Sequence, residues 1–202
     1  MVYKKLYYYF TSALSNYLCD KIVHEGFANQ IQEGNTGRFV ARNDAERKEK
    51  KELRDSNISW IDDWWLKKEI LPYVQRANEK AGWNFKLTNS ESAQFTIYDN
   101  KQHYWWHRDA RQYPYYDNDF PNLIRKLSVT VSLSHPKEYE GGYLQFAATR
   151  DWGDTFKLQC TEILPRGSIC VFPSYTWHRV SPVTKGRSCL LYTSPSPRDA
   201  LT

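Results

Sequence analysis

Hydrophobic and polar positions along this chain follow two different periods. Residues 10–82 carry apolar side chains at helical spacing, whereas residues 86–188 break into short β-rich runs separated by turn residues. No helical pattern of comparable length interrupts the second part, which is typical of an antiparallel sandwich or barrel. The sequence therefore predicts an α+β fold with supporting helices first and a β-core after them.

Two segments of the N-terminal part are predicted to be helices. In the first, Leu14, Leu18 and Ile22 fall at i, i+4 and i+8, which is the spacing of an amphipathic helix. The second covers residues 59–82, where Pro72 should kink the helix or split it in two.

Two further stretches lie beside these helices. Residues 2–10, "VYKKLYYYF", are rich in aromatic side chains and are predicted to form a first strand. Residues 41–56, "ARNDAERKEKKELRDS", form a charge run that is either a solvated loop or the polar face of a short helix.

Length and composition narrow the class of protein. The 202 residues suit one domain, and 8 Trp, 15 Tyr and 9 Phe supply a large core that needs no disulfides. The net charge of +5 permits an acidic small-molecule partner but does not favour a dedicated nucleic-acid binder. The four cysteines form no CxxC pair, and we find neither a signal peptide nor a membrane-spanning run. We therefore expect a cytoplasmic protein without a membrane partner.

A His-X-Asp pair lies in the run "HYWWHRD". If this run is a strand, His107 and Asp109 project from the same face and can hold one metal ion together. The short apolar run "GSICVFP" leads to His178, which would complete a set of two imidazoles and one carboxylate. Such a set leaves three adjacent coordination positions open and indicates non-haem Fe(II) oxygen chemistry rather than zinc.

Arg187 follows His178 by nine residues, across a turn that contains a proline and a glycine. This turn would let the chain return on the next strand with Arg187 pointing inward. A buried guanidinium needs an anionic partner and grips a carboxylate with two hydrogen bonds. A dicarboxylate that binds the metal at one end and Arg187 at the other would explain both features.

A resemblance to a known family is carried by these four side chains and by three stretches, "QFTIYDNKQHYWWHRDA", "LSVTVSLSHPKEYEGGYLQF" and "FPSYTWHRVSPVTKGR". The chain resembles the iron(II)/2-oxoglutarate-dependent oxygenases, and within them the prolyl 4-hydroxylase-like branch with its bacterial and phage members. The resemblance implies one domain over residues 1–188 with a double-stranded β-helix core, a jelly-roll or cupin-like barrel.

The same resemblance implies an enzyme and its cofactors. The enzyme would be a dioxygenase that uses Fe(II), 2-oxoglutarate and O₂, with ascorbate as an auxiliary reductant. It would hydroxylate a substrate C–H bond, in the first place that of a peptidyl proline in a peptide or protein partner, and release succinate and CO₂.

Individual side chains receive roles from the resemblance as well. The implied iron ligands are His107, Asp109 and His178. The implied cosubstrate-binding side chains are Arg187, Tyr98, Thr130 and Ser132. Without the resemblance, Tyr98 is equally well a core ring and Thr130 an ordinary strand residue.

The loop after the metal pair, "RQYPYYDNDFPNL", is long and aromatic. Loops of this kind form lids or substrate grooves, so Tyr113, Tyr115 and Tyr116 are candidates for contact with a proline-containing peptide. A packed loop is the alternative. The tryptophans that flank the ligands are expected only to pack around the metal: Trp105, Trp106 and Trp177.

The C-terminal run "CLLYTSPSPRDALT" departs from the family pattern. Residues 189–192 could form the closing strand of the barrel, but the residues after them are not expected to continue it. The run resembles an in-frame translation of a sequencing-library adapter. We therefore expect residues 189–202 to be a non-native tail and the natural sequence to differ beyond about Ser188.

Two other functions stay open. One is an oxygenase that acts on a nucleobase or a free amino acid. The other is a non-catalytic jelly-roll protein that binds a sugar or a peptide, against which the presence of all four side chains argues.

Overall fold

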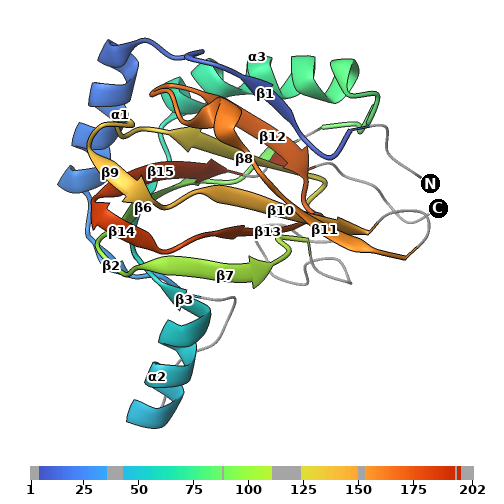
Figure 1. The fold of residues 1–202 in the computed structure, drawn as a ribbon. Helices are drawn as coiled ribbons and strands as arrows, with labels where there is room; N and C mark the ends of the chain where they lie inside the picture. Colours follow the sequence, from blue (N-terminus) through green and yellow to red (C-terminus); the bar gives the residue numbers. More distant parts are fainter. Residues whose placement is uncertain are drawn as a thin grey trace.

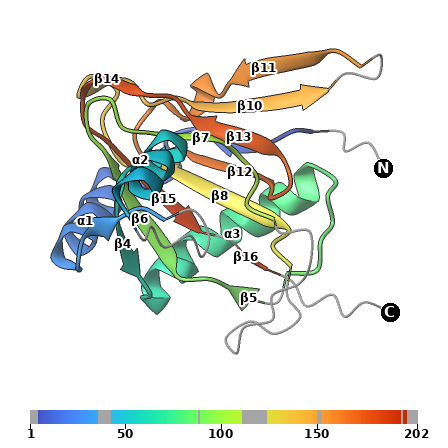
Figure 2. The same ribbon diagram turned by 90° about the horizontal axis from the view of Figure 1, so that it is seen from below.

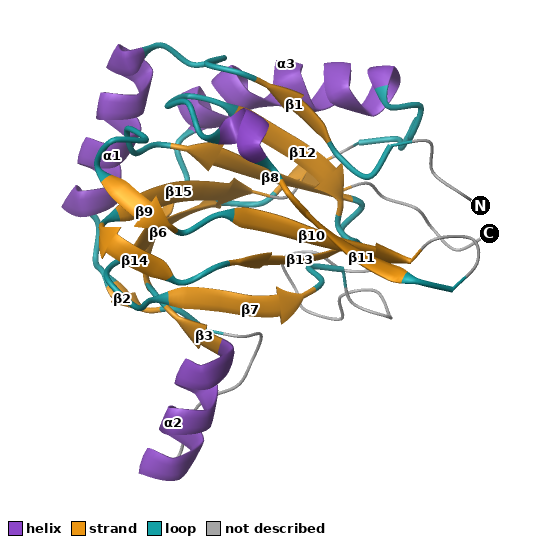
Figure 3. Ribbon diagram, in the orientation of Figure 1, coloured by secondary structure: helices purple, strands orange, loops and turns teal. Residues whose placement is uncertain are grey.

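Two antiparallel sheets face each other in the computed structural model, which describes residues 5–35, 43–87, 89–110, 124–149, 153–193 and 195–196 (Figure 1). Helices cover the outer side of the larger sheet (Figure 3). The predicted α+β class is confirmed. The predicted order is only partly right, because the strands at residues 32–33, 54–55 and 57–61 lie between the helices in the sequence and belong to the two sheets.

The larger sheet has seven strands in the order β1–β12–β8–β15–β6–β4–β2. Their bounds are β1 (Tyr8–Phe10), β2 (Gln32–Glu33), β4 (Asn57–Ile61), β6 (Ala93–Tyr98), β8 (Leu127–Ser132), β12 (Ile169–Pro173) and β15 (Ser188–Thr193). The smaller sheet has the order β11–β10–β13–β7–β3. Its bounds are β3 (Arg54–Asp55), β7 (His103–His107), β10 (Leu144–Thr149), β11 (Thr155–Gln159) and β13 (Trp177–Val180).

Two short pairs complete the strands. They are β9 (Tyr139–Gly141) with β14 (Val183–Gly186), and β5 (Asn89–Ser90) with β16 (Pro195–Ser196). A single 3-10 turn, η1 (Thr161–Ile163), precedes β12. Seen from below, the hairpin of β10 and β11 projects past the neighbouring strands (Figure 2).

The helices are α1 (Asn16–Ala28), α2 (Asp44–Leu53) and α3 (Trp64–Lys80). The charge run forms α2, a short helix that projects from the edge of the smaller sheet (Figure 1). The predicted second helix is α3, which begins at Trp64, so the expectation of a helix from residue 59 is wrong: residues 59–61 belong to β4. It is one helix, so Pro72 does not split it. Within the described ranges, none of the helices combines the length and the apolar character needed to cross a bilayer.

Alternation along the large sheet separates two cores. Phe95 of β6, Val129 of β8 and Leu191 of β15 pack against α1 and α3 in the main core. Residues of the opposite alternation point into the space between the two sheets. Tyr98 of β6 and Leu190 of β15 are examples, and they pack there on the smaller sheet. Polar side chains in this interior are therefore positioned to line a site.

The C-terminal run has a central place in the large sheet. Strand β15 pairs with β6 on one side and β8 on the other, so residues 189–192 do form the closing strand. Thr193 extends it, so the expectation that nothing continues the strand is wrong by this one residue. Pro195–Ser196 form β16, which pairs with β5 in a separate sheet and does not continue β15. The non-native origin of residues 189–202 stays a prediction.

Candidate metal centre and its pocket

Three side chains from two distant parts of the sequence meet at the inner surface of the smaller sheet. His107, Asp109 and His178 each offer one ligand atom, and these atoms lie within 4.8 Å of one another. His107 Nε2 lies 3.5 Å from Asp109 Oδ1, and His178 Nε2 lies 3.5 Å from Asp109 Oδ2. Two imidazoles and one carboxylate in this arrangement fit a divalent iron ion with open coordination positions.

Strand pairing creates this convergence. His107 is the last residue of β7 and stands directly opposite His178 of β13 in the antiparallel register. The backbone N–H groups of Asp109 and Ala110 both donate to the carbonyl oxygen of Ser174 at 2.9 Å, which fixes the turn after β7. The carboxylate is thereby held beside the two imidazoles.

Backbone carbonyls orient both imidazoles. His107 Nδ1 lies 2.7 Å from the carbonyl oxygen of Trp105, and His178 Nδ1 lies 2.9 Å from that of Thr176. A carbonyl oxygen only accepts, so each Nδ1 carries the proton and each Nε2 keeps its lone pair for a metal.

Two serines support the carboxylate. Ser128 of β8 donates to Asp109 Oδ2 at 2.7 Å, and the hydroxyls of Ser128 and Ser174 lie 2.8 Å apart. Ser128 is buried, so this hydrogen bond is shielded from water. Through Ser128, the large sheet thus orients Asp109, which follows strand β7 of the smaller sheet.

The charge states of the cluster suit a metal. Burial alone would raise the pKa of Asp109, but the neighbouring His178 and His107 outweigh it and hold this pKa well below its usual range. Burial, and then repulsion from His107, lowers the pKa of His178 to about 4. An ionised carboxylate and a neutral imidazole are the forms that bind divalent metals.

A cavity of about 500 Å³ opens beside the three side chains. Prominent side chains of its wall are Arg54, Trp60, Gln94, Tyr104, Arg125 and Tyr192. Aromatic rings and guanidinium groups therefore surround the candidate metal centre.

Tyr104 and Arg54 form a layered contact at this wall. The ring centroid of Tyr104 lies 3.5 Å from that of His107 with 12° between the planes, and Arg54 Cζ lies 4.5 Å from the Tyr104 centroid. Arg54 is 5% exposed. Its guanidinium donates to neutral oxygens of Ser56, Asn35 and Gln94. The charge of Arg54 is therefore available to a group that enters the cavity.

Arg187 does not point into the barrel. Its Nε donates to Asp99 Oδ1 at 2.6 Å, and its side chain is 54% exposed. The reason is strand alternation: Ser188 and Leu190 face the interior, so Arg187 projects to the other side. The expectation that Arg187 meets a carboxylate inside the barrel is wrong.

The other expected cosubstrate-binding side chains do lie in the interior. Tyr98, Thr130 and Ser132 are at most 1% exposed. Among the described residues, the hydroxyls of Thr130 and Ser132 have no hydrogen-bond partner, and neither has that of the neighbouring Ser188. The Tyr98 hydroxyl lies 3.5 Å from that of Tyr192. Unpartnered buried hydroxyls are costly unless a ligand satisfies them.

Tyr139 lies near two of these hydroxyls, those of Ser132 and Ser188. Burial raises the pKa of Tyr139, and the nearness of Ser132 and Ser188 opposes that rise. Neither serine, however, stands at hydrogen-bond geometry to it. The hydroxyls of Thr130, Ser132 and Ser188 therefore stay without a partner among the described residues.

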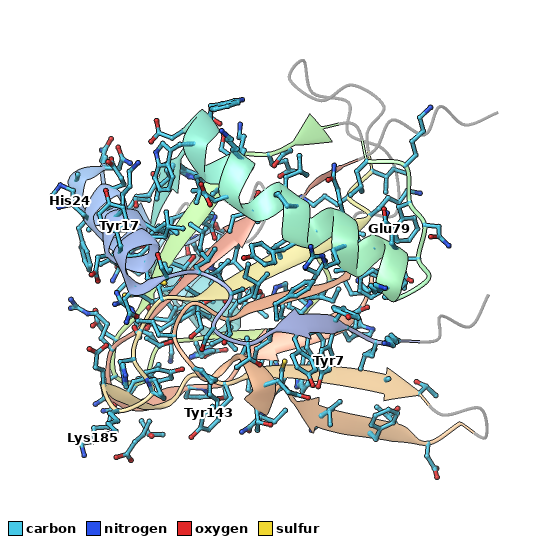
Figure 4. All side chains as sticks on the ribbon, turned by 90° about the horizontal axis from the view of Figure 1, so that it is seen from above. Tyr7, Tyr17, His24, Glu79, Tyr143 and Lys185 are labelled. Atoms are coloured by element: carbon cyan, nitrogen blue, oxygen red, sulfur yellow. The ribbon has the colours of Figure 1, made fainter. Side chains whose placement is uncertain are left out.

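The remaining histidines lie away from the centre. His24 is exposed on α1, where it projects outward as Tyr17 does (Figure 4). His103 contacts the carbonyl oxygens of Lys101 and Glu52, and His135 is exposed. The expected peptide contacts Tyr113, Tyr115 and Tyr116 lie outside the described residues.

Sequence reasoning missed two parts of the site. Ser128 shares a strand face with Thr130 and Ser132, so the i, i+2 alternation of "LSVTVS" contained a signal for it. Arg54 lies inside the charge run, and the polar composition of that run does not indicate that any of its side chains is buried. Only the pairing of Arg54 with Tyr104 across β3 and β7 brings it to the cavity.

A comparison with known protein families shows to which family this chain belongs. Residues 93–193, one half of the chain, match the family model of the 2OG-Fe(II) oxygenase superfamily. The chain belongs to this superfamily, which implies Fe(II), 2-oxoglutarate and O₂ as its cofactors and confirms the resemblance seen in the sequence. The residues of the candidate metal centre lie within the matched segment.

Curated relatives are PKHD-type hydroxylases. The chain is 39% identical over 93 residues to the PKHD-type hydroxylase of Pseudoalteromonas atlantica, an alignment that covers 46% of this chain and 37% of that protein. It is 36% identical over 101 residues to that of Azoarcus sp., covering 46% and 41%. The alignments thus span less than half the length of either relative.

Solved structures of prolyl hydroxylases share the fold. A Pseudomonas putida prolyl-4-hydroxylase matches with a TM-score of 0.67 and 16% identity, covering 96% of this chain and 94% of that one. The viral collagen prolyl hydroxylase of Paramecium Bursaria Chlorella virus-1, in its 2OG complex, matches with a TM-score of 0.62 and 17% identity, covering 96% and 97%. The core is therefore the double-stranded β-helix that these enzymes share.

Proposed function

We propose that this protein is an Fe(II)- and 2-oxoglutarate-dependent dioxygenase that hydroxylates a C–H bond of a peptidyl proline. The observation that carries the proposal is the cluster of His107, Asp109 and His178 at the wall of a cavity. Both imidazoles keep Nε2 free because Nδ1 is bonded to a carbonyl oxygen.

The three ligands would hold the iron, and the surrounding residues keep them in place. When bound, iron supplies the coupling of O₂ reduction to decarboxylation of 2-oxoglutarate: one oxygen atom enters succinate, the other enters the substrate C–H bond, and CO₂ leaves. Ser128 and Ser174 orient the carboxylate for this role, and the pairing of β7 with β13 sets the spacing of the two imidazoles.

The cosubstrate would lie in the interior between the sheets. The unpartnered hydroxyls of Thr130 and Ser132, together with the hydroxyl of Tyr98, are donors that suit the oxygens of a carboxylate. This assignment uses neutral donors and does not use Arg187. Ascorbate would act as an auxiliary that returns oxidised iron to the ferrous state.

A peptide substrate is supported by the character of the cavity wall. Trp60 offers an aromatic face on which a pyrrolidine ring packs, and Arg54 offers donors for backbone carbonyl groups. The solved structures with this fold include a prolyl hydroxylase of Trichoplax adhaerens in complex with a peptide fragment (TM-score 0.59, 14% identity, covering 95% of this chain and 83% of that one).

A reducing compartment, and so the cytoplasm, is supported by the cysteines. All four are free and buried. Cys160 Sγ and Cys170 Sγ lie 4.0 Å apart without a bond between them. Disulfides persist in oxidising compartments, and neighbouring thiols stay free in reducing ones such as the cytoplasm.

The experiment is a turnover assay with Fe(II), 2-oxoglutarate and O₂ that measures both succinate and hydroxyproline. A proline-containing peptide should stimulate succinate formation, and the same peptide with alanine in place of proline should not. Hydroxylation of a nucleobase or a free amino acid instead would overturn the substrate class. Metal binding without any 2-oxoglutarate turnover would favour the non-catalytic binding protein.

A further inference from the structure

The outer face of the smaller sheet carries a cluster of tryptophans and cations. This cluster, the tryptophan face, consists of Trp105, Trp106, Trp177, Arg108, Lys157 and Arg179. Trp105 is 42% exposed and Trp177 is 46% exposed. Large exposed rings that gather on one face mark a binding surface more often than isolated ones do.

An irregularity in strand pairing creates this face. His107 pairs with His178, but Tyr104 pairs with Val180, so β7 has one more residue than β13 between these pairs. Trp105 and Trp106 therefore both stand opposite the single residue Arg179. A β-bulge of this kind turns consecutive side chains to the same side.

Cations and rings alternate across the face. Arg179 Cζ lies 4.7 Å from the ring centroid of Trp105 and 4.9 Å from that of Trp106. Arg108 Cζ lies 4.9 Å from the Trp177 centroid, and Lys157 Nζ lies 5.8 Å from that of Trp106. The rings hold the cations in fixed positions at the surface.

No carboxylate side chain belongs to the four strands that form this face, because β7, β10, β11 and β13 contain neither Asp nor Glu. Among the described helices, α1 and α3 pack on the other sheet, and α2 contacts the edge made by β3 and β7 (Figure 2). The strands of this face thus contribute cations and no carboxylate side chains, which suits an acidic partner.

Arg108 joins the tryptophan face to the cavity. It lines the cavity beside Asp109 and also lies over Trp177 on the outer face. A chain that leaves the cavity past Arg108 would meet Trp177 next. The two surfaces are therefore continuous.

We propose that the tryptophan face binds the acidic, proline-rich segment of the polypeptide that flanks the target proline. This inference rests on the proposed function and deepens it by naming the substrate class. Proline-rich segments dock on grooves lined by aromatic rings, and Asp or Glu side chains between the prolines pair with the three cations. The face selects acidic substrates over basic ones.

Single-stranded nucleic acid also binds surfaces of stacked rings and cations. The tryptophan face is continuous with the cavity, and this favours a polypeptide over a nucleic acid. A polypeptide substrate would occupy the cavity with its target proline and the tryptophan face with its flanking segment. An oligonucleotide is included in the test for this reason.

The test compares three peptides of equal length with one central proline and flanking Glu, Gln or Lys residues. Direct binding is measured in low salt by tryptophan fluorescence, and hydroxyproline formation is measured in parallel. Wild type should bind the Glu peptide about tenfold more tightly than the Lys peptide, and added salt should reduce the difference. The double variant Arg179→Glu, Lys157→Glu should reverse the preference.

A matched control is Lys68→Glu, which changes an exposed cation over a tryptophan, Trp64, on α3. This variant should keep the wild-type preference. Equal binding of the three peptides, an unchanged preference in the double variant, or tighter charge-dependent binding of a single-stranded oligonucleotide than of the Glu peptide would overturn the inference. Charge-dependent binding without hydroxylation of any peptide would overturn the proposed function alone.

Discussion

His107 and His178 stand opposite each other in the register of β7 and β13, with their ring centroids 4.1 Å apart. The candidate metal centre therefore forms only when these two strands are paired. Ser128 ties it to the second sheet through Asp109, so the metal centre also depends on the packing of one sheet on the other.

Ser128→Ala should weaken metal binding about tenfold. The variant removes the hydrogen bond that orients Asp109 but leaves all three ligands present. Titration of the metal-free protein with Fe(II) or Co(II) measures the effect. Ser134→Ala, at a buried serine that accepts from the backbone N–H of Cys189, is the matched control and should bind metal as wild type does. Equal metal affinities of the two variants would contradict the role of Ser128.

The free energy of unfolding of the metal-free protein should fall as the pH is lowered from about 6.5 towards 4. In the folded protein the pKa of His178 is about 4, below its ordinary value of 6.5, so the unfolded chain takes up a proton first. The stability that the neutral imidazole contributes is present above pH 6.5 and is lost on the way down, by at most on the order of 3 kcal/mol.

Urea unfolding at several pH values checks this prediction. His178→Asn should flatten the pH dependence in this window, and the same change at the exposed His135 should not. A wild-type curve no steeper than that of His178→Asn would count against it.

Thr130→Val should stabilise the protein while it weakens 2-oxoglutarate binding. The valine methyl group replaces a buried hydroxyl that has no partner among the described residues, which should raise the free energy of unfolding by about 1 kcal/mol. The cosubstrate loses a donor, so its KM should rise about fivefold. A destabilised variant would mean that the hydroxyl has a partner in the folded protein.

Arg187→Gln should leave the KM for 2-oxoglutarate within about twofold of wild type. Its guanidinium is more than half exposed and paired with Asp99, and an exposed pair of this kind contributes little to stability, on the order of 0–1 kcal/mol. Steady-state kinetics with varied 2-oxoglutarate measures it. A tenfold rise in KM would place Arg187 in the cosubstrate site after all.

Part of the candidate site follows from the sequence alone, and part does not. The triad was accessible because His107 and Asp109 are two residues apart at a strand end, and because His178 follows a recognisable short strand. The sequence does not predict which way the Arg187 side chain points, since this depends on which side of the neighbouring strand β15 faces the interior. A shift of one residue in a strand reverses every side chain on it.

The tryptophans show the same limit. Trp105, Trp106 and Trp177 are expected from the sequence to pack around the metal, and this is wrong. Trp105 and Trp106 stand opposite Arg179 at the outer face, and Trp177 is 46% exposed on the same face. Simple alternation would place Trp105 and Trp106 on opposite faces. The extra residue in β7 changes that, and no local pattern in "HYWWHRD" indicates where a bulge falls.

The most direct test of the central claim is Fe(II)-dependent formation of succinate from 2-oxoglutarate by wild type and by Asp109→Asn. The substitution keeps the shape of the side chain and removes its charge. We predict measurable turnover by wild type and at least about a hundredfold less by Asp109→Asn, with both proteins equally folded by circular dichroism. Equal turnover by the two proteins would contradict the assignment of this carboxylate, and with it the metal centre on which the account rests.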